Sequence, residues 1–199
     1  MNKRVSKIGL YLTIPEPCPY LEARTSTSLV VDPEYSHSLA SISQLTRNGF
    51  RRSGNMIYRP HCDICKSCVS VRIPVNAFQP NRSQRRVLKK NQNIVVERTN
   101  AYYDAEHFKL YLKYQKSRHP ESSMCDDDPL RYREFLMSKN TDTWFNCFYL
   151  DNKLIAVSVI DRLDDGQSAV YTFFDPDMNA RSLGTFAILE MIKEVKATE

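Results

Sequence analysis

The feature that most constrains the fold is a change of pattern part-way along the chain. Residues 1–80 are rich in proline, serine and cysteine and show little helical periodicity, whereas helical and strand-like patterns alternate from Asp104 onward. The first stretch predicts short strands and loops, with strands at residues 8–14 and 69–75 and one helix over residues 38–48. The sequence therefore predicts an α+β protein made of two unlike parts.

Helix caps and turns divide the second half into elements. Asp104 is a candidate cap for a helix, and Asp128 followed by proline starts another. The residues expected on one face of the first helix are Phe108, Tyr111, Leu112 and Gln115. Three strands and a last helix are predicted at residues 144–150, 154–161, 169–174 and 181–196. This order of elements is that of a GNAT-type acyltransferase, so we expect a strand- and loop-rich, cysteine-containing N-terminal region followed by a GNAT-like domain.

Length and composition exclude several classes of protein. The chain has 199 residues, of which 42% are apolar, so it can fill a core of its own. No stretch reaches the roughly 18 apolar residues of a membrane helix, and the N-terminus lacks the apolar run of a signal peptide. Six cysteines without an export signal are expected to be thiols or metal ligands. We therefore expect a globular cytoplasmic protein with no membrane partner.

Three cysteines at regular spacing form the first candidate site. Cys62, Cys65 and Cys68 can converge on one ion, as thiolates do in zinc knuckles and iron–sulfur loops. Three ligands leave one position of a tetrahedral site unfilled, and Cys18 or His61 is a candidate for the fourth ligand. The alternative is a loop of reduced thiols that binds no metal. The run therefore predicts either a zinc or iron–sulfur site or free thiols.

Positive charge clusters in one short segment. In a helix its five cations would line one face: Arg82, Arg85, Arg86, Lys89 and Lys90. Pro80, with Ser83 as a candidate cap, fits a helix start here. Such cations repel one another, and the segment holds no acidic partner, so a phosphate backbone such as that of tRNA explains the stripe better than folding does. The alternative is a solvated basic face.

Arginines and aspartates supply the remaining candidate groups. Arginine binds carboxylates through two parallel N–H bonds, so several arginines near one loop suit an acidic ligand. The arginines concerned are Arg51, Arg52, Arg59 and Arg72. Asp161 ends an apolar predicted strand, where a carboxylate beside a cleft can assist deprotonation of an attacking amine. Catalysis and a structural role are both open for Asp161.

Several long motifs occur in an order that is typical of one enzyme family. The N-terminal motifs are Pro17-Cys18-Pro19-Tyr20-Leu21, Gly49-Phe50-Arg51-Arg52-Ser53-Gly54, Tyr58-Arg59-Pro60 with the cysteine run, and Val71-Arg72-Ile73-Pro74-Val75. The later motifs are Asn81-Arg82-Ser83-Gln84-Arg85-Arg86, Val170-Tyr171-Thr172-Phe173-Phe174-Asp175-Pro176-Asp177 and Arg181-Ser182-Leu183-Gly184. From about residue 8 to residue 191 the chain resembles the bacterial branch of the arginyl-tRNA–protein transferase family, the aspartate/glutamate leucyltransferases.

The resemblance implies a reaction and its partners. Leucine would pass from leucyl-tRNA to the α-amine of acceptor proteins that begin with Asp or Glu, marking them for degradation by the N-degron route. No covalent enzyme intermediate and no cofactor is required. Arginyl-tRNA is the alternative donor for the same acceptors, and a non-catalytic nucleic-acid-binding module is the alternative from another class. An acetyl-CoA-dependent enzyme is disfavoured, because the segment before the last helix has a single glycine.

The resemblance also implies a division of roles. Residues 1–80 would form the N-terminal substrate-recognition (N-degron) domain, residues 81–100 a basic linker and helix facing tRNA, and residues 101–199 the GNAT-like aminoacyl-transfer domain. The four arginines would grip the acceptor carboxylate, Asp161 would keep the acceptor amine unprotonated, and Tyr171 would lie nearby on the next strand. Relatives continue for several dozen residues beyond the position where this chain stops. The resemblance therefore implies an incomplete acyltransferase sheet and, if the chain is truncated, weak or absent activity.

Overall fold

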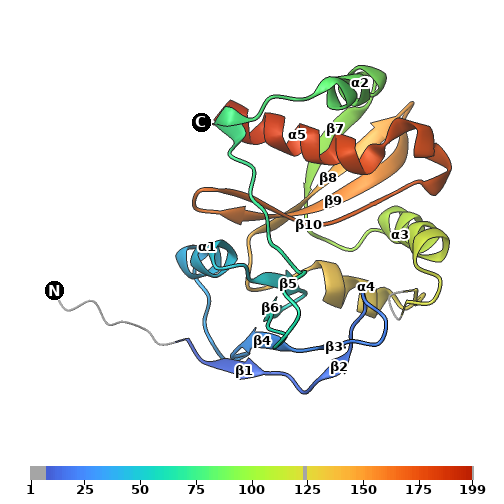
Figure 1. Cartoon of the computed structure of the whole chain (residues 1–199). Helices are drawn as coiled ribbons and strands as arrows, with labels where there is room; N and C mark the ends of the chain where they lie inside the picture. Colours follow the sequence, from blue (N-terminus) through green and yellow to red (C-terminus); the bar gives the residue numbers. More distant parts are fainter. Residues whose placement is uncertain (1–7, 123–124, 199) are drawn as a thin grey trace.

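The first of two main β-sheets is small and lies in the lower half of the molecule (Figure 1). The computed structural model describes residues 8–122 and 125–198. This sheet has the order β1-β4-β6-β5 and antiparallel pairing, with strands β1 (Leu10–Leu12), β4 (Ser28–Val31), β5 (Arg51–Ser53) and β6 (Met56–Pro60). A separate pair consists of β2 (Glu16–Pro17) and β3 (Thr25–Ser26). Ile42 and Leu45 of helix α1 (Leu39–Arg47) pack on this sheet with Phe50, forming its core.

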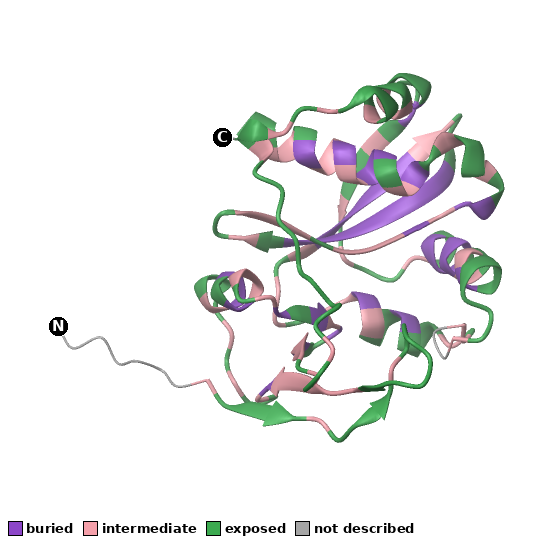
Figure 2. Cartoon of the chain, viewed as in Figure 1, coloured by how far each residue is buried: buried purple, intermediate pink, exposed green. Residues whose placement is uncertain are grey.

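The second sheet carries the larger core. Its order is β10-β9-β8-β7, antiparallel throughout, with strands β7 (Val95–Asn100), β8 (Thr143–Leu150), β9 (Lys153–Leu163) and β10 (Gly166–Phe174). Helices cover both faces: α2 (Arg82–Lys90) and α5 (Leu183–Thr198) one, α3 (Ala105–Arg118) and α4 (Pro129–Leu136) the other. The central strands are therefore almost wholly buried (Figure 2). No helix in the described ranges has the length and apolar character needed to cross a bilayer.

Capping side chains explain where the helices begin. The predicted caps Asp104 and Asp128 are confirmed, since each carboxylate accepts backbone N–H bonds from the first turn of its helix. The prediction of Ser83 as a cap for α2 is wrong. Asn81 takes this place, because its side chain accepts from the Gln84 backbone N–H while the Gln84 side chain accepts from that of Asn81.

The strands predicted in the second half are confirmed, with two differences around them. An additional strand, β7, precedes α3 and pairs with β8 along its whole length. The last helix begins at Leu183 rather than at residue 181, because a short 3-10 helix, η2 (Pro176–Arg181), and a left-handed Ser182 (φ 53°) come first. Residues 95–100 alternate only weakly, because four of the six are exposed and the other two are partly buried. The sequence pattern therefore does not reveal this strand.

The strand predicted at residues 69–75 is wrong. These residues belong to an extended connection that runs along the outside of the molecule from β6 to α2, ending in the 3-10 helix η1 (Val75–Ala77) (Figure 1). Val69 is 75% exposed and Val71 is 82% exposed. Alternating apolar residues form a strand only where a sheet edge is available for pairing, and this connection crosses between sheets instead. The strand predicted at residues 8–14 is present but shorter, as β1.

The segment at residues 81–100, expected to be a basic linker and helix, contains the helix α2 and the strand β7, and both belong to the second sheet and its covering helices. The basic helix is present as α2, and its Val87 and Leu88 pack into the core that α5 forms on the sheet. The remainder of the segment leads into β7, an edge strand. The change between the two halves therefore lies within the connection between β6 and α2.

Candidate functional site

A cavity of about 430 Å³ lies at the junction of the two sheets. Residues from β5, β6 and α1 line it from the first half, and residues from α4, β9 and β10 line it from the second. Its polar and aromatic lining includes Arg51, Arg52, Tyr58, Phe135, Asp161 and Tyr171. A ligand in this junction cavity would therefore contact both halves of the molecule at once.

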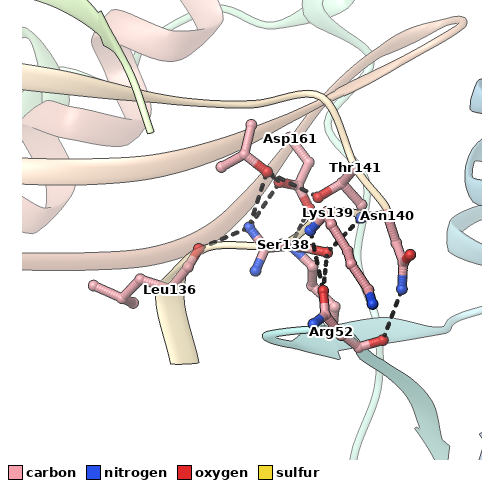
Figure 3. A network of polar contacts seen from close by, with 9 residues as sticks. Arg52, Leu136, Ser138, Lys139, Asn140, Thr141 and Asp161 are labelled. Carbon is pink, nitrogen blue, oxygen red and sulfur yellow. Dashed lines mark hydrogen bonds and ion pairs between the residues drawn. The ribbon is translucent and has the colours of Figure 1, made fainter. Parts of the chain in front are cut away.

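Arg52 on β5 and Asp161 on β9 form a two-point ion pair across the junction (Figure 3). The Nε–Oδ2 distance is 2.6 Å and the Nη2–Oδ1 distance is 2.8 Å. Thr143 Oγ1 donates to the same Oδ1 at 2.6 Å, and Arg52 Nη2 also donates to the Leu136 carbonyl oxygen at 3.1 Å. The two side chains are only 4% and 5% exposed. Removing either partner would leave a buried, unpaired charge, which is costly.

The turn between β5 and β6 docks on the end of α4 and the segment that follows it. Asn55 Oδ1 accepts a hydrogen bond from the Lys139 backbone N–H at 3.0 Å. Gly54 has a φ of +57°, and a Cβ at this position would lie 1.8 Å from the Glu134 carbonyl oxygen. Only glycine fits here, because both the backbone conformation and the space exclude a side chain. This docking fixes the position of Arg52, which lies on the strand that leads into the turn.

The ion pair bears on the roles predicted for its two members. Both carboxylate oxygens of Asp161 already accept hydrogen bonds, which counts against Asp161 as the proton acceptor for an amine. Arg52 uses Nε and Nη2 on Asp161, so it cannot also grip a second carboxylate at two points. Its Nη1 is buried and has no hydrogen-bond partner within the described ranges. Both roles stay predictions, and the geometry favours an anchoring role for the pair.

The other three predicted arginines are in different surroundings. Arg51 lines the junction cavity and a neighbouring one, with its guanidinium 5.7 Å from the centroid of the Tyr58 ring. It forms no ion pair within the part of the chain that the structure describes. Arg59 Nη1 and Arg72 Nη2 donate to backbone carbonyls at the end of α1, at 2.9 and 2.6 Å. Arg51 is thus the arginine whose charge is available at the junction.

Tyr171 on β10 lines the junction cavity together with Asp161. Its Oη accepts a hydrogen bond from Gln115 Nε2 on α3 at 3.0 Å. Burial raises the pKa of Tyr171 to about 12, although the hydrogen bond from Gln115 acts to lower it. The two predicted catalytic residues are therefore brought to one cavity. The sequence indicates for Gln115 only a place on a helix face, and no local pattern pairs it with a tyrosine on a later strand.

A second cavity of about 710 Å³ shares Tyr20, Arg51 and Tyr58 with the first and holds the cysteine loop. All four predicted metal ligands line it: Cys18, Cys62, Cys65 and Cys68. Within residues 8–122 and 125–198, no group of three or more His, Cys, Asp and Glu side chains is arranged to hold a metal ion. Cys65 Sγ instead donates to Ser67 Oγ at 3.4 Å, and this contact lowers the pKa of the thiol. A zinc or iron–sulfur site at these cysteines stays a prediction.

The five cations of α2 lie on the outer surface of the molecule. All of them are exposed: Arg82, Arg85, Arg86, Lys89 and Lys90. Arg85 Nη1 donates to the Pro80 carbonyl oxygen and Lys90 Nζ to that of Ala180, each at 2.6 Å. None of the five forms an ion pair with a residue that the structure describes. Their charge is therefore not neutralised by the described part of the protein.

A charged cluster that the sequence patterns do not predict lies at the end of β10. The buried carboxylate of Asp175 accepts hydrogen bonds from Lys113 Nζ at 2.5 Å and Lys153 Nζ at 3.1 Å. It also accepts from the Asp177 backbone N–H at 3.1 Å and so caps η2. Burial acts to raise the pKa of Asp175, but the three hydrogen bonds together hold it below its usual value. The cluster links α3, β9 and β10 beside the start of α5.

Comparison with known proteins covers both halves of the chain. Residues 16–86 match the family described as "Arginine-tRNA-protein transferase, N terminus", and residues 106–199 match "Arginine-tRNA-protein transferase, C terminus". The chain is 43% identical over 194 residues to the aspartate/glutamate leucyltransferase of Teredinibacter turnerae, covering 97% of this chain and 80% of that protein. It is 47% identical over 189 residues to the protein of that name from Nitrosococcus oceani, covering 94% and 79%. The corresponding values for Chromobacterium violaceum are 42% over 193 residues, covering 97% and 80%.

Proposed function

Since the chain belongs to the arginine-tRNA–protein transferase family, we propose that it transfers leucine from leucyl-tRNA to the α-amine of proteins whose first residue is Asp or Glu. The names of the relatives support leucine as the donor group and the two acidic residues as acceptors. The added leucine would mark the acceptor for degradation by the N-degron route. The same proposal puts the protein in the cytoplasm, where charged tRNA is available.

The observation that carries this proposal is a difference in ion pairing between two neighbouring arginines at the junction cavity. Arg52 is neutralised by Asp161, whereas Arg51 keeps its charge and reaches both cavities. A cationic guanidinium beside an aromatic ring, with no acidic partner among the residues that the structure describes, suits the side-chain carboxylate of an acceptor. Arg59 lines the second cavity and Arg72 lies outside both, so their predicted contacts to the acceptor would be indirect.

The proposed chemistry is aminolysis of an ester that is already activated. The acceptor nitrogen attacks the carbonyl carbon of the leucyl ester, a C–N bond forms and the C–O bond to the tRNA ribose breaks. The amine loses a proton, and the ribose oxygen gains one. Because the free amine has a pKa of about 8, part of it is already unprotonated near neutral pH. Holding the two reactants together can therefore supply most of the rate enhancement.

The donor would be held by α2. Its five exposed cations lie on one surface and have no acidic partner in the described residues, which is the arrangement expected for sequence-independent contact with a phosphate backbone. We take the β7–β10 sheet with its helices as the GNAT-like aminoacyl-transfer domain and the first sheet as the region that reads the acceptor. The cysteine loop, as the wall of the second cavity, would shape the path of the acceptor chain whether or not it binds a metal.

The test is a transfer assay with purified protein, labelled leucyl-tRNA or arginyl-tRNA, and peptides that begin with Asp, Glu or Ala. We expect leucine to be added to the first two peptides only. Transfer of arginine instead would favour the alternative donor. Binding of tRNA without transfer to any peptide would contradict the proposal and leave the non-catalytic nucleic-acid-binding module.

Arg51→Ala tests the acceptor site in the same assay. Loss of a charged hydrogen-bonding partner should raise KM for the Asp peptide about 10- to 100-fold and leave KM for leucyl-tRNA unchanged. Arg133→Ala is the matched control, because Arg133 is an exposed arginine on α4 outside both cavities. Equal behaviour of the two variants would exclude Arg51 as the carboxylate-binding residue.

A further inference from the structure

Gln115 is a fully buried polar residue in a mainly apolar and aromatic core. It lies on α3, and its exposed fraction is 0%. Around it, the core between α3, α4 and the second sheet contains Phe108, Tyr132 and Phe173. Taking an amide out of water costs free energy unless it is hydrogen-bonded, so an amide at this place requires a specific partner. A leucine or methionine would fill the same space without that cost.

The amide nitrogen of Gln115 has Tyr171 as a hydrogen-bond partner, whereas its buried Oε1 has none among the described residues. Gln115 Nε2 donates to Tyr171 Oη at 3.0 Å. The Tyr171 ring packs edge-on against Phe135, with centroids 5.0 Å apart and an interplanar angle of 75°. A second edge-on contact is made with Tyr114 at 6.5 Å and 89°. The amide and the two rings fix both the plane of the phenol ring and the position of its oxygen.

The direction of this hydrogen bond decides what the phenol can offer. Because Tyr171 Oη accepts from Gln115, the hydrogen of its own hydroxyl is turned away from the amide. In the described part of the chain no acceptor takes this hydrogen, and Tyr171 lines the junction cavity together with Arg52 and Asp161. The free hydroxyl hydrogen is therefore available to a ligand in that cavity.

We propose that Gln115 is a positioning residue that orients the Tyr171 hydroxyl so that it donates a hydrogen bond to the carbonyl oxygen of the leucyl ester as negative charge develops there. This inference rests on the proposed function. Tyr171 would be the catalytic residue, because it touches the reacting group, and Gln115 would act only through it. No proton leaves the phenol. The proton lost by the amine ends on the ribose oxygen, and the collapse of the intermediate restores the carbonyl.

Burial of Tyr171 is consistent with this role. Because burial raises its pKa to about 12, the phenol keeps its proton at neutral pH and serves as a hydrogen-bond donor, not as a base. Donors aimed in advance at the position of an oxyanion are among the larger contributions to catalysis. An amide that cannot ionise is suited to hold such a donor, because its direction of donation does not change with pH.

The test is a double-mutant cycle on kcat and KM with leucyl-tRNA and an Asp peptide. Tyr171→Phe should lower kcat about 100-fold with little change in KM for either substrate. Gln115→Leu should lower kcat about tenfold, the effect of one lost orienting hydrogen bond. The double variant should be no slower than Tyr171→Phe alone, because Gln115 acts only through the phenol. The inference would be overturned if the two reductions in kcat multiplied in the double variant, or if Gln115→Leu kept the kcat of the wild type.

Gln115→Glu supplies a readout that a purely structural role would not change. The shape is kept, but an ionised carboxylate accepts a hydrogen bond from Tyr171 and turns the hydroxyl away from the substrate. We expect kcat of this variant to match Tyr171→Phe at high pH and to recover as the pH falls and the carboxyl group becomes protonated. A pH profile parallel to that of the wild type would count against the inference.

Leu110→Ala is the stability control, since Leu110 is a buried apolar residue of the same helix outside the cavity. It should lower the unfolding temperature and leave kcat unchanged at temperatures where the protein is folded. Absence of transfer by the wild type would overturn both the proposed function and this inference. Transfer by the wild type together with unaffected Gln115 variants would overturn this inference alone.

Discussion

The two sheets differ in how they are stabilised. The second sheet has helices on both faces and two separate groups of buried apolar residues. The first has one helix and a core of five buried apolar residues, and its strand β1 exposes all three of its side chains. The second sheet can therefore hold its shape largely by itself, whereas the first depends on its contacts with the second. The proposed acceptor site lies on the dependent half, where small changes of position are easiest.

Two arginines of the first half form ion pairs with aspartates of the second, and the surroundings of the two arginines are opposite. Arg52 and Asp161 are almost fully buried, whereas Arg47 and its partners Asp164 and Asp165 are between 31% and 51% exposed. Exposed pairs are screened by water and salt and contribute little. The buried pair should therefore be the contact that sets the position of the first sheet.

The largest effect is expected from Asp161→Ala. It leaves the Arg52 guanidinium buried without its partner, which should lower the free energy of unfolding by about 3–5 kcal/mol in urea titration. Hydrogen exchange should show the loss mainly in β5, β6 and α1. Asp165→Ala is the matched control across the same junction and should leave the urea midpoint nearly unchanged. Equal losses of unfolding free energy in both variants would contradict the claim that the buried pair contributes more than the exposed one.

A smaller effect is expected from Gly54→Ala. The new methyl group would overlap the Glu134 carbonyl oxygen and require a left-handed alanine, so the turn must move away from α4. We expect a loss of about 2–3 kcal/mol in thermal or urea unfolding. Gly184→Ala, in α5, is the control: its added Cβ would meet only Phe174 at 3.4 Å, and it should be neutral or slightly stabilising. A neutral Gly54→Ala would show that the turn is not fixed against α4.

The smallest expected effect is a dependence of the free energy of unfolding on pH, which comes from a buried histidine in the second half of the molecule. Burial lowers the pKa of His107, although Asp104 and Glu106 act to raise it. The unfolded chain therefore binds a proton at a higher pH than the folded one, so stability is present above about pH 6.5 and falls as the pH decreases below it. We expect the free energy of unfolding to be lower at pH 5 than at pH 7.

His107→Leu should remove most of this loss when urea unfolding is repeated across the same pH range. His119→Gln, a change of an exposed histidine beyond the end of α3, should leave it in place. His37 in the first half also has its pKa lowered by burial, so a residual slope in the His107→Leu variant is expected to come from there. An unchanged slope in that variant would assign the whole effect to the first half.

The sequence predicts the second half of the fold better than the first, for a physical reason. Residues such as Asp104, Asp128 and the 151–153 turn act on their own neighbours, and the elements they delimit are found as expected. The strands of the first half are held by pairing between distant segments, such as β4 with β6, and leave no strong local period. For the same reason, the apolar alternation at residues 69–75 predicts a strand that has no partner.

The candidate site shows the same limit. The sequence singles out Arg52, Asp161 and Tyr171 by residue type and position, but it does not show that the first two neutralise each other. Nor does it indicate the roles of Gln115 and Thr143, which come from what these residues contact across the fold. Residue chemistry is readable along the chain, whereas the pairing of those residues is a property of the packed structure.

The buried ion pair has a consequence for synthesis on the ribosome. Arg52 and Asp161 are separated by 109 positions, so at about 5–20 residues per second the arginine emerges roughly 5–20 s before its partner. Throughout that interval the first sheet holds an uncompensated charge at the place where it will later dock. The N-terminal half is therefore expected to acquire its final arrangement only after β9 has left the exit tunnel. Nascent chains arrested before β9 emerges should be cut by protease within β5 and β6, and chains arrested after it should resist.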